Sequence, residues 1–254
     1  MRVVLTRPEH DAACWSEALQ ARGHDTLLLP LIAIASAPDP LPLHRAWARL
    51  GDFAAVMFVS ANAVRQFKAA EPARSWPVRT RAWATGPGTA AALQAAGVPK
   101  DLIDSPASEA VQMDSEALWA VVSTRIVPGD RVLIVRGVDA DGHPSGRDWL
   151  AQQLHDAGAS VEKVAAYQRS MPVWSIGQLA HARRAASDGS VWVFSSSEAL
   201  DNLRSLLPGV EWSRARAIAT HPRIARAAED TGFGVVWLSR PDLEAVAAVL
   251  ESSG

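Results

Sequence analysis

The feature that most constrains the fold is an internal duplication, in which three segments of the chain recur about half a chain length further on. The paired segments are AAVMFVSANAV (54–64) with SVWVFSSSEAL (190–200), RTRAWATGPGTAAALQAAGV (79–98) with RARAIATHPRIARAAEDTGF (214–233), and MRVVLTRP (1–8) with DRVLIVRG (130–137). A repeat of this length within 254 residues predicts two similar domains rather than a solenoid of short units.

Short runs rich in β-branched residues alternate with helical stretches rich in Ala and Leu. The predicted strands are Arg2–Thr6, Thr26–Leu29, Ala55–Val59, Arg81–Ala84, Leu102–Asp104, Arg131–Arg136, Val161–Ala165, Val191–Phe194, Ala215–Ala219 and Val235–Leu238. The predicted helices include Asp11–Ala21, Ala61–Ala70, Pro87–Ala96, Gly146–Ala157, Ser197–Leu206, Pro222–Thr231 and Asp242–Leu250. Alternation at this spacing indicates parallel α/β sheets.

The order of the repeated segments predicts that one domain is discontinuous. The opening strand–helix–strand of one copy lies at the start of the chain, and the rest of that copy follows only after residue 170. We therefore expect one α/β domain over residues 1–35 with 171–254 and a second over 36–170. Each domain would be a parallel, five-stranded, flavodoxin-like sheet flanked by helices. The chain would then cross between the domains near Pro30–Ala35 and Tyr167–Pro172, which predicts a hinge with a cleft between two lobes.

The loops that follow the strands are the predicted binding loops, because ligands of open α/β sheets bind beyond the carboxyl ends of the strands. These loops are rich in Ser, Thr, Gly and Arg, and most run directly into a helix, whose free N–H groups suit carboxylate or phosphate. The candidate substrate-binding residues are Thr6, Arg7, Ser60, Asn62, Thr85, Gly86, Thr89, Arg136, Gly137, Arg147, Ser195, Ser196, Thr220 and Arg223.

Simpler roles remain open for these residues. Ser, Thr and Asn at helix starts can be N-caps only, and His221 can satisfy local backbone. Tyr167, the only tyrosine, falls at the second crossover, where a phenol could donate a proton to a leaving group or simply pack at the junction. TGPGTAAA lacks the third glycine of the dinucleotide fingerprint and the lysine of the P-loop, so it is weak evidence for a nucleotide. The ten tryptophans are dispersed, which favours core packing.

Composition excludes several classes of protein. The formal net charge of −2 gives no support to nucleic-acid binding, and the single cysteine excludes an internal disulfide and a cysteine-based metal site. None of the seven histidines is spaced to bind a metal from one helix face, so no metal is predicted. The N-terminus lacks a signal-peptide core, and charges interrupt every long apolar run. We expect a cytoplasmic protein that does not contact membranes.

Six segments, in order, resemble the uroporphyrinogen-III synthase family over essentially the whole chain. These are VVLTRPE, FVSANAV, ATGPGTAAAL, VLIVRG followed by GRDWL, VAAYQR and VFSSSEAL. The resemblance implies two α/β domains joined by a two-stranded linker, with the active site in the cleft. It also implies a monomer that uses no cofactor and makes at most transient contact with the preceding pathway enzyme.

The implied activity is the closure of hydroxymethylbilane to uroporphyrinogen III, with loss of water and inversion of ring D through a spiro intermediate. Tyr167 matches the family's cleft tyrosine and is the candidate catalytic residue, while Thr89, Ser60, Ser196 and Arg147 match cleft-lining positions. One departure is Ile224, which replaces the threonine that many members carry in the second copy of the GPxTA-type loop, so that Thr220 or Arg223 would substitute for it.

Two rival readings remain. A two-lobed ligand-binding or regulatory module would need a signal peptide or an output domain. A nucleotide-using α/β enzyme would need the missing phosphate-loop lysine and its acidic partner.

Overall fold

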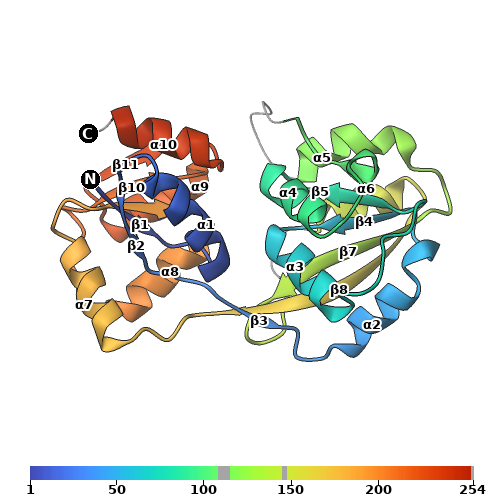
Figure 1. The fold of residues 1–254 in the computed structure, drawn as a ribbon, viewed down its shortest axis with the longest axis horizontal. Coiled ribbons are helices and arrows are strands. Elements are labelled where there is room, and N and C mark those ends of the chain that lie inside the picture. Colours follow the sequence, from blue (N-terminus) through green and yellow to red (C-terminus); the bar gives the residue numbers. More distant parts are fainter. Residues whose placement is uncertain (108–114, 145–147, 253–254) are drawn as a thin grey trace. The chain divides into compact units, whose positions relative to one another are not determined.

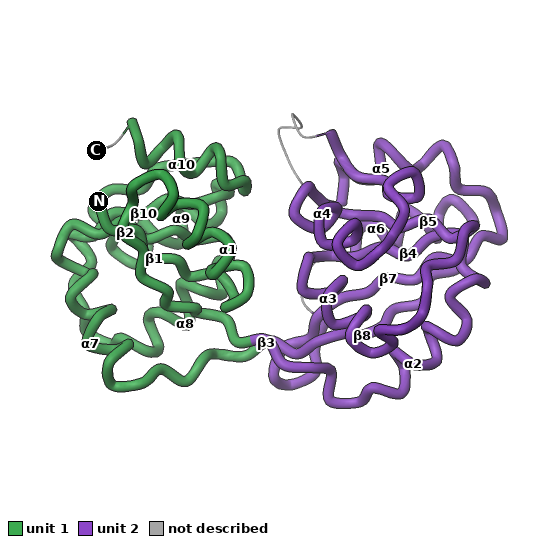
Figure 2. Tube along the Cα trace, viewed as in Figure 1, with its two compact units in different colours: residues 1–33, 170–254 green, residues 34–169 purple. Residues whose placement is uncertain are grey.

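The computed structural model describes residues 1–107, 115–144 and 148–252. The chain is an α/β protein with two sheets, and it divides into two compact units. Unit 1 comprises Met1–Ala33 with Ser170–Gly254, and unit 2 comprises Ile34–Arg169 (Figure 2). Unit 1 is thus built from the two ends of the chain, and unit 2 from its middle.

Unit 1 contains a five-stranded sheet in the order β11-β10-β9-β1-β2, in which every pair of neighbours is parallel. Figure 1 shows the ribbon of this unit with helices and strands labelled where there is room. Its elements are β1 (Arg2–Leu5), α1 (Glu9–Gln20), β2 (Asp25–Leu28), α7 (Ile176–Ala185), β9 (Val191–Phe194), α8 (Ser197–Leu206), β10 (Arg216–Ala219), α9 (Pro222–Thr231), β11 (Val235–Leu238) and α10 (Leu243–Ser252). Gly232 ends α9 with a left-handed φ of 100°, a conformation that helix C-termini often adopt at glycine.

Unit 2 contains a six-stranded sheet in the order β3-β8-β7-β4-β5-β6. Its elements are β3 (Ala33–Ser36), α2 (Leu41–Ala48), β4 (Ala55–Phe58), α3 (Ala61–Ala70), β5 (Arg81–Ala84), α4 (Pro87–Ala95), β6 (Ile103–Asp104), α5 (Ser115–Val122), β7 (Arg131–Val138), α6 (Trp149–Asp156) and β8 (Ser160–Ser170), with short 3₁₀ turns at Leu50–Asp52, Lys100–Leu102 and Ser123–Arg125. The pairs from β8 to β6 are parallel.

The duplicated segments occupy equivalent places in the two sheets. The order β8-β7-β4-β5-β6 in unit 2 repeats the order β2-β1-β9-β10-β11 in unit 1. Residues 54–64 and 190–200 form β4 with the start of α3 and β9 with the start of α8, so the same sequence pattern builds the same strand–loop–helix piece twice. The chain order of these pieces differs between the units. After the edge strand β3, unit 2 starts with β4, which is equivalent to β9, the third strand of unit 1 along the chain.

The prediction of five strands in the second unit is wrong, because β3 adds a sixth at its edge. The sequence pattern predicts a crossover near residues 30–35 and a neighbouring strand that ends at Ala165. The strand β8 instead continues to Ser170. Its extension exposes a further row of backbone N–H and C=O groups. Because such groups are rarely left without a partner, β3 pairs with them.

The core of unit 2 lies on both faces of its sheet, as expected for parallel strands covered by helices on each side. Val56 and Phe58 of β4 pack in one apolar cluster with α2, α3 and α4, whereas Ala55 and Met57 pack on the opposite face with α5 and α6. In unit 1, alternate residues of β1, β9 and β10 form a cluster with α1 and α10. Trp83 and Trp192 are among the largest fully buried side chains, which confirms a packing role for these tryptophans.

Candidate functional site

In each unit, the described candidate residues lie at or near the carboxyl ends of parallel strands. In unit 1 the order of the strands reverses between β1 and β9, and in unit 2 it reverses between the equivalent strands β7 and β4. Loops that leave the sheet at such a point run in opposite directions and leave room for a ligand. The residues that follow these four strands are therefore the best-placed candidates in each unit.

The central feature of unit 2 is a hydroxyl pair formed by Ser60 and Tyr167. The Ser60 Oγ and the Tyr167 Oη lie 3.1 Å apart and share a hydrogen bond. Ser60 is also the N-cap of α3, where its Oγ accepts a hydrogen bond from the Ala63 backbone N–H at 3.2 Å. Tyr167 is 4 % exposed and belongs to the apolar cluster of α2, α3 and α4. The packing role considered for Tyr167 is thus confirmed, whereas donation to a leaving group stays a prediction.

Gly137 lies directly against the ring of Tyr167. The two residues are register partners in β7 and β8, and a Cβ added to Gly137 would lie 2.4 Å from the Tyr167 Cζ. Gly137 is buried, and the Tyr167 ring is what covers it. It therefore does not lie in an open loop.

The other candidates of unit 2 surround the start of two helices. Gly86 is the N-cap of α4, and Thr89 is buried in the first turn of that helix. The Thr85 Oγ1 donates to the Val59 carbonyl at 3.3 Å, and the Asn62 Oδ1 accepts from the Arg65 Nη2 at 2.7 Å. Thr85 and Asn62 therefore belong to local networks at the ends of β4 and β5.

Arg136 is held by a carboxylate that the sequence analysis did not single out. Its guanidinium lies 2.9 Å from Asp148, which also pairs with Lys163 at 2.8 Å. The Lys163 ammonium, together with Arg136, lowers the pKa of the Asp148 carboxyl below its ordinary value. Asp148 stands in the GRDWL segment quoted for the family resemblance, which is the only signal that marked it. Arg147, its neighbour in the chain, lies outside the described residues.

In unit 1, Thr6 and Arg7 follow the central strand β1. Thr6 is buried, and its Oγ1 donates to the Val193 carbonyl of β9 at 2.6 Å, which joins the two strands at their carboxyl ends. The Arg7 guanidinium stacks on the Trp15 ring at 3.8 Å from the ring centroid. Its Nη2 donates to the Pro241 carbonyl at 3.4 Å, while its Nε is buried without a hydrogen-bond partner among the described residues.

Burial lowers the pKa of Arg7 to about 10, although the negative charge of Asp11 offsets part of this effect. The guanidinium therefore stays charged at neutral pH. A partly buried guanidinium is a suitable partner for a carboxylate, because charge-assisted hydrogen bonds are stronger than neutral ones.

The remaining candidates of unit 1 lie at the starts of α8 and α9. Ser196 is the N-cap of α8 but makes no side-chain cap hydrogen bond, and Ser195 precedes it directly after β9. Thr220 is 8 % exposed, whereas Arg223 is exposed on the first turn of α9. His221 caps that helix, since its Nδ1 accepts from the Arg223 N–H at 3.1 Å, as the simpler reading expected.

Ile224 and Thr89 occupy the same place in the two copies, the third residue of α9 and of α4. Ile224 is 4 % exposed and Thr89 is 6 % exposed. Both side chains are thus packed inward at the helix start, which explains why an apolar residue is tolerated at this position in unit 1.

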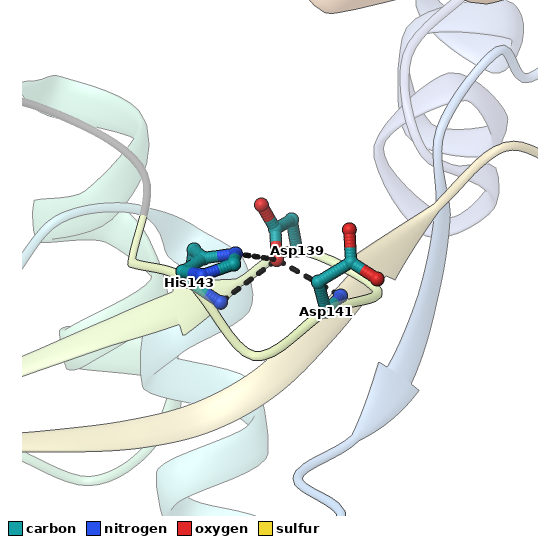
Figure 3. A group of neighbouring side chains, drawn as sticks. All are labelled: Asp139, Asp141 and His143. Atoms are coloured by element: carbon teal, nitrogen blue, oxygen red, sulfur yellow. Dashed lines mark hydrogen bonds and ion pairs between the residues drawn. The ribbon is translucent and has the colours of Figure 1, made fainter.

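The loop after β7 also brings together two carboxylates and an imidazole, Asp139, Asp141 and His143 (Figure 3). The Asp139 Oδ1 accepts from the Asp141 and His143 backbone N–H groups at 3.0 and 2.8 Å. These hydrogen bonds give Asp139 a structural role in closing the turn, and all three side chains are partly or largely exposed.

In the part of the chain that the structure describes, no helix has the length and apolarity needed to cross a membrane.

The sequence of this chain is similar to those of known proteins. The family model described as Uroporphyrinogen-III synthase HemD matches residues 14–248. A uroporphyrinogen-III synthase of Synechococcus elongatus is 29 % identical over 217 residues, which cover 83 % of this chain and 77 % of the relative.

Solved structures support the same fold. The uroporphyrinogen-III synthetase of Helicobacter pylori aligns with a TM-score of 0.59 at 18 % identity, over 100 % of both chains. A mutant uroporphyrinogen III synthase of Thermus thermophilus aligns with a TM-score of 0.55 at 16 % identity, over 100 % of this chain and 98 % of that one. Because the family model spans most of the sequence and the fold agrees, the chain belongs to the uroporphyrinogen-III synthase family.

Proposed function

We propose that this chain converts hydroxymethylbilane to uroporphyrinogen III, with loss of water and inversion of ring D through a spiro intermediate. As a member of its family, the chain is a cyclising lyase of tetrapyrrole biosynthesis. The observation that carries the proposal is the match of the family model to residues 14–248, which include both sets of carboxyl-edge loops except Thr6 and Arg7.

The chemistry of the substrate agrees with the residues at these loops. Hydroxymethylbilane is an open chain of four pyrroles with acetate and propionate groups, and it is therefore a flexible polyanion. Arg7 offers a partly buried cation, and the starts of α4 and α8 offer helix N-termini. The substrate carboxylates would bind to these donors.

The proposed reaction begins with departure of the terminal hydroxyl group as water. The Tyr167 phenol donates a hydrogen bond or a proton to this hydroxyl, and an electrophilic azafulvene remains. Ring D attacks it through its substituted carbon to give a spiro intermediate, which fragments and recloses with ring D turned over. The linear substrate also closes without help to the uninverted isomer, so the main task of the enzyme is to hold the chain in the geometry that favours the spiro route.

The proposed substrate-binding residues are those of the sequence analysis, with Arg147 among them. Gly137 is the exception, because the Tyr167 ring covers it. The two-stranded linker, the cleft, the cytoplasmic location, the monomeric state and the lack of a cofactor stay predictions.

The test is a coupled assay. The preceding enzyme generates hydroxymethylbilane in the cuvette, and the porphyrins formed after oxidation are separated by isomer, with this protein and with a heat-inactivated sample as the control. We expect the product to shift from the type I to the type III isomer. Type I alone from folded protein would refute the proposal and favour a ligand-binding module.

A further inference from the structure

We propose that Gly137 is a positioning residue for Tyr167, a glycine gap in β7 through which the tyrosine ring reaches Ser60. From its place after a strand, Gly137 is a candidate substrate-binding residue, but the geometry assigns it to the support of the phenol. The catalytic meaning of this support rests on the proposed function, whereas the positioning itself does not.

The first observation is a register shift between β7 and β8. Arg136 pairs with Ala165, but Gly137 pairs with Tyr167, so Ala166 has no register partner. In a regular strand, neighbouring residues point to opposite faces, and one inserted residue reverses the faces of all that follow. Val164, Ala166 and Tyr167 all belong to the same apolar cluster, which regular alternation would not allow for the last two. The bulge therefore turns Tyr167 onto the face that carries α3 and α4.

The second observation is the path of the ring across the sheet. The strand order is β8-β7-β4, Tyr167 lies on β8, and its hydroxyl partner Ser60 follows β4. The ring must therefore pass over β7, which lies between the two. Adjacent strands are about 4.8 Å apart, so the side chain on β7 at this level decides whether the path is open.

That position is Gly137. A Cβ there would lie 2.4 Å from the Tyr167 Cζ and 2.5 Å from its Cε2, far inside ordinary van der Waals contact. The Cζ atom carries the hydroxyl group, so any residue other than glycine would displace the very atom that fixes the Oη. Ser60 completes the arrangement, because its Oγ is itself fixed by the Ala63 N–H and lies 3.1 Å from the Oη.

The first test uses the fact that Tyr167 is the only tyrosine in the chain. Protein labelled with ¹³C at the tyrosine Cζ gives a single NMR resonance that reports the surroundings of this hydroxyl. We expect Gly137→Ala and Ser60→Ala to move the resonance. The matched control is Gly51→Ala in the same unit, where an added Cβ meets no atom within 4 Å and the resonance should not move. An unchanged resonance in folded Gly137→Ala would overturn the proposal.

The second test separates positioning from a general need for glycine. Gly137→Ala should lower the unfolding temperature in the natural chain and leave it nearly unchanged in a Tyr167→Ala chain, where no ring is displaced. An equal loss in both backgrounds would overturn the proposal. If Gly137→Ala does not fold, the double variant decides: a folded double variant supports the proposal, and an unfolded one refutes it.

The activity readout comes last and is independent of the first two. Gly137→Ala should lower kcat in the natural chain and add no further loss in a Tyr167→Phe chain, where no hydroxyl remains to be misplaced. Full turnover by Tyr167→Phe alone would refute the proposed role of the phenol, yet the resonance and the unfolding temperatures would still decide the role of Gly137.

Discussion

At the residue scale, two polar side chains show how burial gives a side chain a defined task. Tyr167 is 4 % exposed, and its hydroxyl group has a hydrogen-bond partner in Ser60. Arg7 stacks on Trp15 and keeps a buried Nε without a partner among the described residues. A buried charge without full hydrogen bonding lowers stability, and such an arrangement is typical of a group kept for a ligand.

Replacement of Tyr167 by Phe should lower turnover by about a hundredfold, because a positioned proton donor contributes about 10²–10⁴ to a rate. The ring remains, so the free energy of unfolding should fall by about 1 kcal/mol, the net value of one hydrogen bond. Isomer-resolved turnover and thermal unfolding measure the two effects. Unchanged turnover would remove the phenol from the mechanism.

Replacement of Arg7 by Met should raise the KM for hydroxymethylbilane by about tenfold or more, as expected for loss of one charge-assisted hydrogen bond. The unfolding temperature should stay the same or rise, because Met keeps the contact with Trp15 and removes a poorly solvated charge. Steady-state kinetics and calorimetry give both numbers.

The matched control for this variant is Arg2→Met, at the opposite end of the same strand, where Arg2 pairs with Asp25 on the surface. It should leave the KM unchanged. A KM for Arg7→Met equal to that of the natural chain would mean that Arg7 only packs against Trp15 and Pro241.

At the element scale, one carboxylate ties three elements of unit 2 together. Asp148 precedes α6 and pairs with Lys163 of β8 and Arg136 of β7. Gly137 directly follows Arg136 in β7, and Tyr167 follows Lys163 by four residues in β8. The ion pairs therefore hold the two strands together just before the bulge. The pairs are partly exposed, which limits the stability that they contribute.

Asp148→Asn should therefore lower the free energy of unfolding at pH 7 by about 1 kcal/mol or less. The pKa of Asp148 is lowered in the folded protein, so its contribution is present above the ordinary carboxyl pKa and is lost as the pH falls through the folded-state value. Denaturant unfolding at several pH values should show the gap between the two proteins closing in acid. A gap that widens in acid would contradict the assignment.

At the scale of the whole molecule, the chain is two copies of one strand order with different connections. Unit 2 has its own sheet and its own apolar clusters on both faces. Every residue of these clusters belongs to unit 2. Unit 1 is assembled from the two ends of the chain, so its sheet forms only when distant segments meet.

Residues 34–169 expressed alone should therefore fold, because they carry the six-stranded sheet with a core of its own and lack only the first residue of β3 and the last of β8. Circular dichroism measures the secondary structure of the fragment, and urea unfolding shows whether it unfolds cooperatively. The control is residues 170–254 alone, which lack β1 and β2 of their sheet and should not unfold cooperatively. A fragment 34–169 without a cooperative transition would show that unit 2 needs the rest of the chain.

The sequence by itself determined the α/β class, the duplication and the ends of most strands and helices. Strands such as Val191–Phe194 and helices such as Ala61–Ala70 are predicted with the bounds that the structure has, because apolar periodicity and helix caps are local signals. The family assignment is also confirmed, since it depends on ordered segments that can be read directly from the chain.

Only the tertiary structure decided the sixth strand, the pairing of Arg136 with Asp148 and the burial of Tyr167. The strand β3 is as long as β9, but its residues are only partly buried or exposed and Ile34 is its only β-branched residue, so its sequence lacks the buried apolar run that marks a strand such as β9. It forms because β8 offers backbone partners. The bulge at Ala166 reverses the faces of Tyr167 and the residues after it, in a strand whose sequence reads as regular. Such features depend on contacts between residues far apart in the chain, and the spacing of residues along the sequence does not encode them locally.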